Sequence, residues 1–225
     1  MKLLSLSCIT LVLTSAVLNT SITISGAKDT LRSQPKKPTL GIVDRQIVPG
    51  KRVGAIVETT SYSNLVQLFG AKKLSESEFN GAEGELKLPA TIVNFGKNKE
   101  LKVVWKDRTR NRVFMTLVRD PDWYTSSGVR VGMTFPQLRK VAGKFQVSGL
   151  GWDYGNIVSF PTLKTNPFAG MGIKVDADEK AMVQFPKDYQ AVSGDRSPLA
   201  DDDARWQRLN MRVTVLEVSY QRLSK

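Results

Sequence analysis

The sequence predicts an α+β protein made of two similar halves, each with a short helix packed on an antiparallel sheet. Two helix-like segments, residues 59–70 and 132–143, have the same apolar spacing, and both end in glycine. Strand-like segments follow the two helices in the same order. The matched pairs are residues 91–95 with 156–160 and residues 101–103 with 173–175. Corresponding segments in the same order indicate an internal duplication.

The N-terminus has the pattern of an export signal. Lys2 precedes an apolar stretch followed by small residues that export peptidases recognise, which predicts a signal peptide over residues 1–27. An uncleaved membrane anchor is the alternative. A lipoprotein is disfavoured, because Cys8 lies inside the apolar stretch rather than after it. We therefore expect an exported protein, periplasmic or extracellular, with no transmembrane segment once the signal is removed.

The rest of the chain is expected to divide into a linker and two repeats. Residues 28–38 are polar and basic and contain two prolines, which is typical of a flexible linker. The first α+β repeat is expected over residues 39–124 and the second over residues 125–225. With 225 residues, of which 41% are hydrophobic, the chain suits one large or two small domains.

Each predicted helix has an apolar face at i, i+3, i+4 spacing. The faces consist of Leu65, Leu68 and Phe69 in the first helix and of Leu138, Val141 and Ala142 in the second. Thr134 and Gln137 have the spacing of a capping box, in which two side chains satisfy backbone amides at the start of the helix. Gly70 and Gly143 are expected to end the helices, because glycine adopts a positive φ without strain.

The remaining patterns predict strands and one more helix. The expected strands are a hairpin of residues 101–107 and 112–118, a second hairpin over residues 172–185 that turns at 176–179, and a final strand over residues 211–220. In the final strand, Val213, Val215 and Val218 are expected to face the core. Residues 197–209 are expected to form a short helix capped by Ser197. Asp201, Asp202 and Asp203 would then lie at the solvated start of this helix.

The composition excludes several kinds of chemistry. The chain has no histidine, and its one cysteine lies in the predicted signal. Histidine-based triads, most zinc sites, cysteine nucleophiles and disulfides are therefore excluded from the mature chain. We expect no cofactor, no metal and no enzymatic activity. The formal net charge of +12 favours an anionic partner such as phospholipid or anionic glycan, with plain solubility as the alternative explanation.

Residues 149–156, with the sequence GLGWDYGN, combine glycine with aromatic residues. They fit neither a phosphate-binding loop nor a dinucleotide fingerprint. They predict a hairpin connection in which Gly149, Gly151 and Gly155 supply a positive φ or a bulge. The alternative is a recognition loop that displays two aromatic anchors. The predicted binding surface consists of Trp152, Asp153 and Tyr154, with Trp123 and Tyr124 adjacent.

A second candidate site is cationic. It consists of Lys106, Arg108, Arg110 and Arg112, which recur at every second position. In extended conformation such residues share one face, which predicts a site for phosphates or anionic glycan. The alternative is a charged hairpin that discourages pairing between sheet edges, since a turn at residues 108–111 would splay the four side chains.

Paired carboxylates leave a second class of function open. The candidates are Asp120, Asp122, Asp153 and Glu83. A hydrolase of cell-wall glycan would use two of them, held roughly 5–10 Å apart in a cleft. A turn is the alternative for Asp120 and Asp122, because the sequence Asp-Pro-Asp is common in turns.

Two sets of residues carry a resemblance to a known family. The first half contributes Ile47, Pro49, Gly50, Gly54, Leu65, Phe69 and Gly70, and the second contributes residues 128–134, Gly143 and residues 149–155. With these residues the chain resembles a family of uncharacterised bacterial exported proteins with a GxGWDYG motif, over about residues 40–220. Asn156 departs from the glycine of that pattern, but asparagine also tolerates a positive φ. The resemblance implies export and is nearly silent on activity.

A shorter similarity begins at Gly132-Met133-Thr134 and runs through the following helix. This segment is similar to the start of small outer-membrane assembly lipoproteins and to each half of the tandem β-lactamase inhibitor proteins. In those proteins, helical hairpins pack on antiparallel sheets, and the proteins bind other proteins. By analogy of fold, the resemblance implies binding rather than catalysis. We therefore expect an exported, non-enzymatic binding protein of the cell envelope. Its partner would be a protein or an anionic glycan or lipid, and not nucleic acid.

Overall fold

The computed structural model describes residues 44–81, 84–161 and 165–220. These residues belong to one compact unit, Pro38–Lys225. The predicted signal peptide and linker lie outside the described residues, and so does Glu83.

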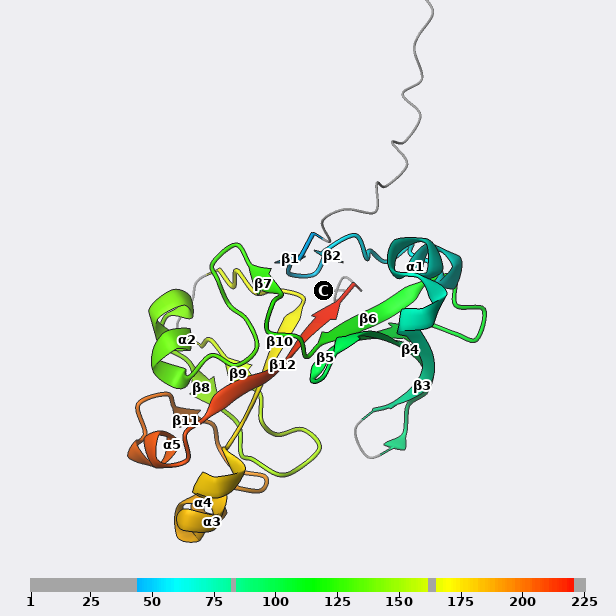
Figure 1. The fold of residues 1–225 in the computed structure, drawn as a ribbon. Helices are drawn as coiled ribbons and strands as arrows, with labels where there is room; N and C mark the ends of the chain where they lie inside the picture. Colours follow the sequence, from blue (N-terminus) through cyan, green and yellow to red (C-terminus); the bar gives the residue numbers. More distant parts are fainter. Residues whose placement is uncertain (1–43, 82–83, 162–164, 221–225) are drawn as a thin grey trace, which may run out of the picture. The chain divides into compact units, whose positions relative to one another are not determined.

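The largest element of the fold is a six-stranded antiparallel sheet with the strand order β10-β12-β6-β5-β4-β3. Its strands are β3 (Leu74–Asn80), β4 (Lys87–Gly96), β5 (Lys99–Trp105), β6 (Val113–Val118), β10 (Met171–Asp176) and β12 (Arg212–Ser219). In Figure 1, the red strand β12 lies between the yellow strand β10 and the green strand β6. Strands from both predicted repeats therefore belong to one continuous sheet.

Two small three-stranded sheets accompany the large one, with the orders β2-β1-β7 and β11-β8-β9. The strands are β1 (Gln46–Val48), β2 (Arg52–Val53), β7 (Tyr124–Thr125), β8 (Gln146–Val147), β9 (Val158–Ser159) and β11 (Leu199–Ala200). The pair β1 and β7 is parallel, and the other pairs are antiparallel. With the short helices, these sheets make the α+β fold that the sequence predicts.

The helices are short. They are α1 (Tyr62–Phe69), the 3-10 helix η1 (Ala71–Lys73), α2 (Phe135–Ala142), α3 (Glu179–Gln184), α4 (Pro186–Val192) and α5 (Ala204–Arg208). The two helices predicted from glycine-ended apolar patterns, α1 and α2, are confirmed. In α2, the backbone amide of Thr134 donates to Oε1 of Gln137 at 2.9 Å, one of the two bonds of the predicted capping box. The glycines that follow them, Gly70 and Gly143, both have positive φ.

Two sequence predictions near the C-terminus are wrong. Residues 172–185 do not form a hairpin, because β10 is followed directly by α3. The carboxylate of Asp178 accepts hydrogen bonds from the amides of Lys180 and Ala181, which starts a helix where a turn was expected. Likewise α5 is capped by Asp203 rather than Ser197. Between Ser197 and Asp203, the residues Leu199–Ala200 form β11 and pair with β8 instead.

Each of the two confirmed helices covers a cluster of aromatic rings in the core. Below α1, Phe69 contacts Phe95 with ring centres 5.6 Å apart, and Phe95 contacts Trp123 at 6.0 Å. Below α2, Phe135 contacts Phe145 at 5.1 Å and Trp206 at 5.9 Å. Leu65 in α1 and Leu138 in α2 are both fully buried. The sheet-rich region below α1 and the sheet-rich region below α2 are thus consistent with two similar halves.

The central strands supply the rest of the core. Val213, Val215 and Val218 of β12 are buried, as predicted for the final strand. The predicted hairpin of residues 101–107 and 112–118 is also confirmed, because β5 and β6 pair antiparallel. Among the residues that the structure describes, no helix is long and apolar enough to cross a membrane.

Candidate functional site

The glycine- and aromatic-rich segment, residues 149–156, forms a loop between β8 and β9, and we call it the aromatic loop. The two strands pair antiparallel, with Val147 opposite Val158, so the predicted hairpin connection is confirmed. A backbone hydrogen bond of 3.0 Å from the amide of Asn156 to the carbonyl of Gly149 closes the loop at its base.

The glycines of the aromatic loop serve two different purposes. Gly151 has a φ of 72°, and Asn156 has a φ of 64°, so both occupy the left-handed region. Gly149 and Gly155 do not have a positive φ, so that part of the prediction is wrong for them. They are glycines because there is no room for a Cβ atom, which would overlap the carbonyl oxygen of Gly194 in one case and of Gly149 in the other.

Both ends of the aromatic loop are tied to neighbouring elements. The amide of Leu150 donates to the carbonyl of Val192 at 2.9 Å, and the amide of Gly194 donates to the carbonyl of Leu150 at 2.8 Å. The side-chain amide of Asn156 donates to the carbonyl of Val175 at 3.0 Å. The side chain of Leu150 is fully buried. These contacts tie the loop to β10 and to the end of α4.

Two aromatic side chains lie on this fixed loop. The indole Nε1 of Trp152 donates to the carbonyl of Gly149 at 3.0 Å, and the Trp152 ring is half-buried. The ring of Tyr154 meets it edge-on, with centres 5.5 Å apart, and Tyr154 is 47% exposed. Neighbouring Ile157 is also exposed. An aromatic ring that is held in place and still meets solvent is a typical anchor for a binding partner.

A polar cavity of about 440 Å³ borders the aromatic loop. Its lining comprises Gly151, Trp152, Asp153, Gly155, Asn156, Lys174, Val175, Asp176 and Thr214. Lys174 on β10 forms an ion pair of 3.3 Å with Glu217 on β12. The sequence did not predict Lys174, Asp176 or Thr214 as site residues, because they reach the loop only through the pairing of distant strands.

The predicted neighbours of the aromatic loop do not extend its surface. Trp123 is fully buried, so its assignment to a binding surface is wrong. Its ring packs against Phe95, and its Nε1 donates to Asp120. Tyr124 is 48% exposed, but it belongs to β7 in another sheet.

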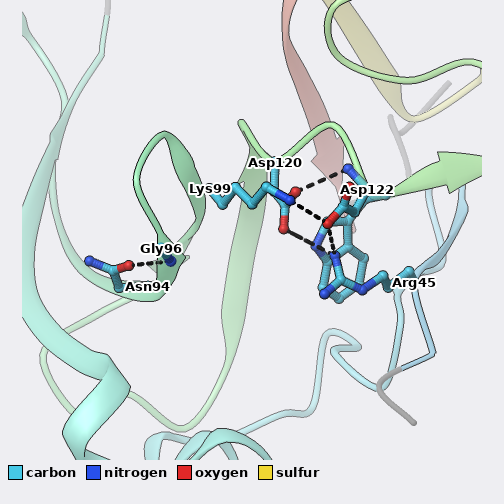
Figure 2. A network of polar contacts seen from close by, with 7 residues as sticks. Arg45, Asn94, Gly96, Lys99, Asp120 and Asp122 are labelled. Atoms are coloured by element: carbon cyan, nitrogen blue, oxygen red, sulfur yellow. Dashed lines mark hydrogen bonds and ion pairs between the residues drawn. The ribbon is translucent and has the colours of Figure 1, made fainter.

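The paired carboxylates, Asp120 and Asp122, form an ionic network rather than a cleft (Figure 2). The side chain of Asp120 is 0% exposed and accepts hydrogen bonds from Nε1 of Trp123 at 3.2 Å, the amide of Asp122 at 3.0 Å and the Arg45 guanidinium at 3.3 Å. Asp122 pairs with Arg45 at 2.9 Å and with Lys99 at 2.7 Å. The hydrogen bond from Lys99 lowers the pKa of Asp122. These contacts therefore favour a structural role for Asp120 and Asp122 over acid–base chemistry.

The predicted cationic site is largely neutralised. Lys106 and Arg112 share Glu58, at 2.8 and 3.5 Å, and the hydrogen bond from Lys106 lowers the pKa of Glu58. Arg110 pairs with Glu76 at 2.7 Å, and its guanidinium lies 5.4 Å from the centre of the Tyr62 ring. Within the described part of the chain, Arg108 forms no ion pair. The four cations thus do not form one continuous charged face.

No group of three or more acidic, cysteine or histidine side chains among the described residues is placed to hold a metal ion. No family model matches the chain, and no curated protein matches it. Among solved structures, the chain is similar to the uncharacterized protein yfeY from Escherichia coli, with 14% sequence identity and a TM-score of 0.45. The match covers 76% of this chain and 98% of that one.

Proposed function

We propose that this chain is an exported, non-enzymatic binding protein of the cell envelope, and that it contacts its partner through the aromatic loop. The observation that carries the proposal is that the ring of Tyr154 is exposed on a loop that hydrogen bonds tie to neighbouring elements. Tyr154 is 47% exposed, although hydrogen bonds at Leu150 and Asn156 tie the loop to the elements beside it. Because the loop is ordered before binding, little conformational entropy is lost when a partner docks.

The partner that fits best is a protein or an anionic component of the envelope. Tyrosine and tryptophan are frequent anchors at protein interfaces, which favours the first. The formal charge of +12 favours the second. The charges beside the loop do not add to this argument, because Lys174 pairs with Glu217 and the same cavity is lined by Asp153 and Asp176. Export rests on the sequence pattern of residues 1–27.

The glycan-hydrolase alternative gains no support from Asp120 and Asp122. Asp120 cannot reach a glycan, because its side chain is 0% exposed. Asp122 is held in its charged form by Lys99 and Arg45, whereas a general acid must carry a proton near neutral pH. We therefore prefer binding to hydrolysis.

A matched pair of tyrosine variants tests the proposed surface. Tyr154→Ala removes the exposed ring of the aromatic loop, and Tyr124→Ala removes a ring of similar exposure, 48%, from β7. The immobilised proteins are incubated with envelope extract, and retained proteins and glycans are identified by mass spectrometry. We expect Tyr154→Ala to lose about tenfold or more of a partner that wild type and Tyr124→Ala retain. Equal retention by all three, with unchanged melting temperatures, would rule this surface out.

A further inference from the structure

The six-stranded sheet has one edge that no described strand covers. This edge is β3, which ends the strand order and pairs with β4 on its inner side. Figure 1 shows β3 at the rim of the sheet. The opposite edge is partly covered, because the amide of Val175 on β10 donates to the carbonyl of Asn156 at 2.9 Å, and Ile157 bridges to Lys174. Among the described residues, β3 is therefore the edge that is open to a further strand.

The hydrogen-bonding pattern identifies the backbone groups of β3 that point outward. Beyond the end of the strand, the amide of Gly81 donates to the carbonyl of Leu86 at 2.7 Å, so these two residues form a hydrogen-bonded pair. Hydrogen-bonded and non-hydrogen-bonded pairs alternate along an antiparallel ladder, so the N–H groups of Glu76 and Glu78 point away from β4. Pro89 lies opposite Glu78 and fits this pattern, because proline has no N–H to donate to β3.

β3 lacks several features that usually protect an edge strand from pairing. It contains no proline and no lysine, and its pairing with β4 has no bulge. The carbonyl of Glu78 accepts a long hydrogen bond of 3.4 Å from the exposed Nζ of Lys102. A cavity of about 560 Å³ borders the strand, and Glu76 and Glu78 line it. Open backbone groups beside a cavity are typical of a site where an extended peptide adds a strand to a sheet.

The charges of β3 determine which strand can pair with it. In the antiparallel register that pairs the full length of β3 with a second copy, Glu76 lies opposite Glu78. A shift of the register by two residues places one of these glutamates opposite its own copy. Like charges at directly opposite positions are destabilising, whereas opposite charges attract. The edge therefore disfavours a second copy of this chain and favours a strand that carries basic residues.

Three cations line the same cavity, and they differ in what they can do. Arg110 already pairs with Glu76 at 2.7 Å, and Lys87 belongs to β4, on the far side of β3 from an added strand. Arg108 forms no ion pair within the described part of the chain, so an acidic strand is the alternative that a test must separate. The net charge of the whole chain matters less, because charges beyond about 8 Å are largely screened at physiological salt.

We propose that β3 binds an extended, basic segment of a partner protein by strand addition. The backbone of that segment would form hydrogen bonds with Glu76 and Glu78, and its lysine or arginine side chains would lie beside the two carboxylates. Side chains alternate between the faces of a strand, so apolar residues of the segment would lie on the other face, beside the half-buried Phe79. The proposal is independent of the aromatic loop, which connects strands of another sheet.

Hydrogen exchange measured by nuclear magnetic resonance tests strand addition. The probe is a short peptide of alternating lysine and valine at physiological salt. We expect a Kd of about 1 mM or below, and at saturation the amides of Glu76 and Glu78 should exchange about tenfold or more slowly. The amide of Ser77, which points to β4, should change little. The same peptide with methylated backbone nitrogens, or with glutamate in place of lysine, is expected to bind at least about tenfold more weakly.

Three variants separate the contributions of backbone and charge. Glu78→Pro removes an outward N–H without removing a bond to β4, so peptide binding should be lost. Glu78→Gln is its matched control: it keeps the N–H, removes only the charge and should weaken binding about threefold. Arg108→Gln should not weaken binding of the lysine peptide. If Glu78→Pro does not fold, Glu78→Gln and the methylated peptide decide the question.

Three results would overturn the proposal. Tighter binding of the glutamate peptide, lost in Arg108→Gln, would assign the edge to an acidic strand. Signal shifts without slower exchange at Glu76 and Glu78 would indicate binding without strand addition. Protection of these two amides that grows with protein concentration in the absence of peptide would identify a second copy of this chain as the partner.

Discussion

At the scale of single residues, buried carboxylates are the unusual feature of this protein. Asp120 and Asp201 are both buried, but they differ in how their charge is satisfied. Asp120 accepts three hydrogen bonds, from Trp123, Asp122 and Arg45, and so joins the residue before β1 to the turn before β7. Asp201 has an ion pair with Arg139 and one oxygen without a donor. The first carboxylate is held mainly by hydrogen bonds, whereas the second depends on its ion pair with Arg139.

The role of Asp120 predicts a clear loss of stability on substitution. Asp120→Asn places an amide NH₂ against donors that need an acceptor, so at least one buried hydrogen bond is lost. We expect the free energy of unfolding, measured by urea denaturation, to fall by about 2 kcal/mol. Asp122→Asn in the same network should cost clearly less, because the Asp122 side chain is 44% exposed. An Asp122→Asn variant that is less stable than Asp120→Asn would contradict the structural role of Asp120.

At the scale of elements, the sequence predicts best where local residues decide the structure. The start of α2 follows from Thr134 and Gln137, and the pairing of β5 with β6 follows from their apolar patterns. The aromatic loop was found from composition alone. The opposite wall of its cavity was not predicted, because Lys174 and Thr214 reach it through the pairing of β10 with β12. The two-residue strand β9 lies inside the strand-like segment 156–160, whereas β11 depends on tertiary contacts and leaves almost no pattern in the sequence.

Prediction failed where two local signals compete. The segment that contains α3 carries valine and alternating polar residues, as a strand would, but Asp178 also offers a helix cap. In the structure the cap determines the outcome. Asp201, expected at the solvated start of a helix, is buried instead. The helix begins three residues later, after Asp203.

The two covering helices make equivalent contributions to the core, which predicts equivalent losses. Leu65→Ala in α1 and Leu138→Ala in α2 each remove a fully buried side chain. We expect each to lower the free energy of unfolding by about 3 kcal/mol in a single urea transition, because β6 and β12 pair within one sheet. Val183→Ala in α3 is the control, since Val183 is 83% exposed, and it should change stability by less than about 0.5 kcal/mol. Two separate transitions in either leucine variant would argue against a shared folding unit.

At the scale of the whole molecule, titratable groups set the pH range of stability. A hydrogen bond from the backbone of Gln46 lowers the pKa of Asp44, and hydrogen bonds from Lys99 and Arg205 lower the pKa of Asp122 and Asp203. Burial raises the pKa of Tyr220, whose hydroxyl lies 3.0 Å from that of Thr116. The carboxylates stabilise the folded state above the unfolded pKa, whereas Tyr220 stabilises it below the unfolded pKa.

Because the pKa of the carboxylates is lowered and that of Tyr220 is raised, the free energy of unfolding should decrease at both the acid edge and the alkaline edge of the pH range. As pH falls below about 4, the unfolded chain binds protons more readily than the folded one, so stability decreases. Above about pH 10, an unfolded tyrosine ionises while Tyr220 stays protonated, and stability decreases by up to about 1.4 kcal/mol per pH unit. Tyr220→Phe should flatten the alkaline edge and leave the acid edge in place. Urea denaturation across this pH range measures both, and an unchanged alkaline slope in Tyr220→Phe would refute the assignment.

The close packing of the aromatic loop has a consequence for how this protein can diversify. A Cβ atom at Gly149 would overlap the carbonyl oxygen of Gly194, and one at Gly155 would overlap that of Gly149, so almost any replacement at either position would distort the loop. Tyr154 points outward and is free of that limit. Mutational scanning should therefore find that Gly149 and Gly155 tolerate few replacements and that the exposed residue Tyr154 tolerates many. For the binding surface proposed above, new specificities would then arise by exchanging the ring at residue 154 while Gly149 and Gly155 stay fixed.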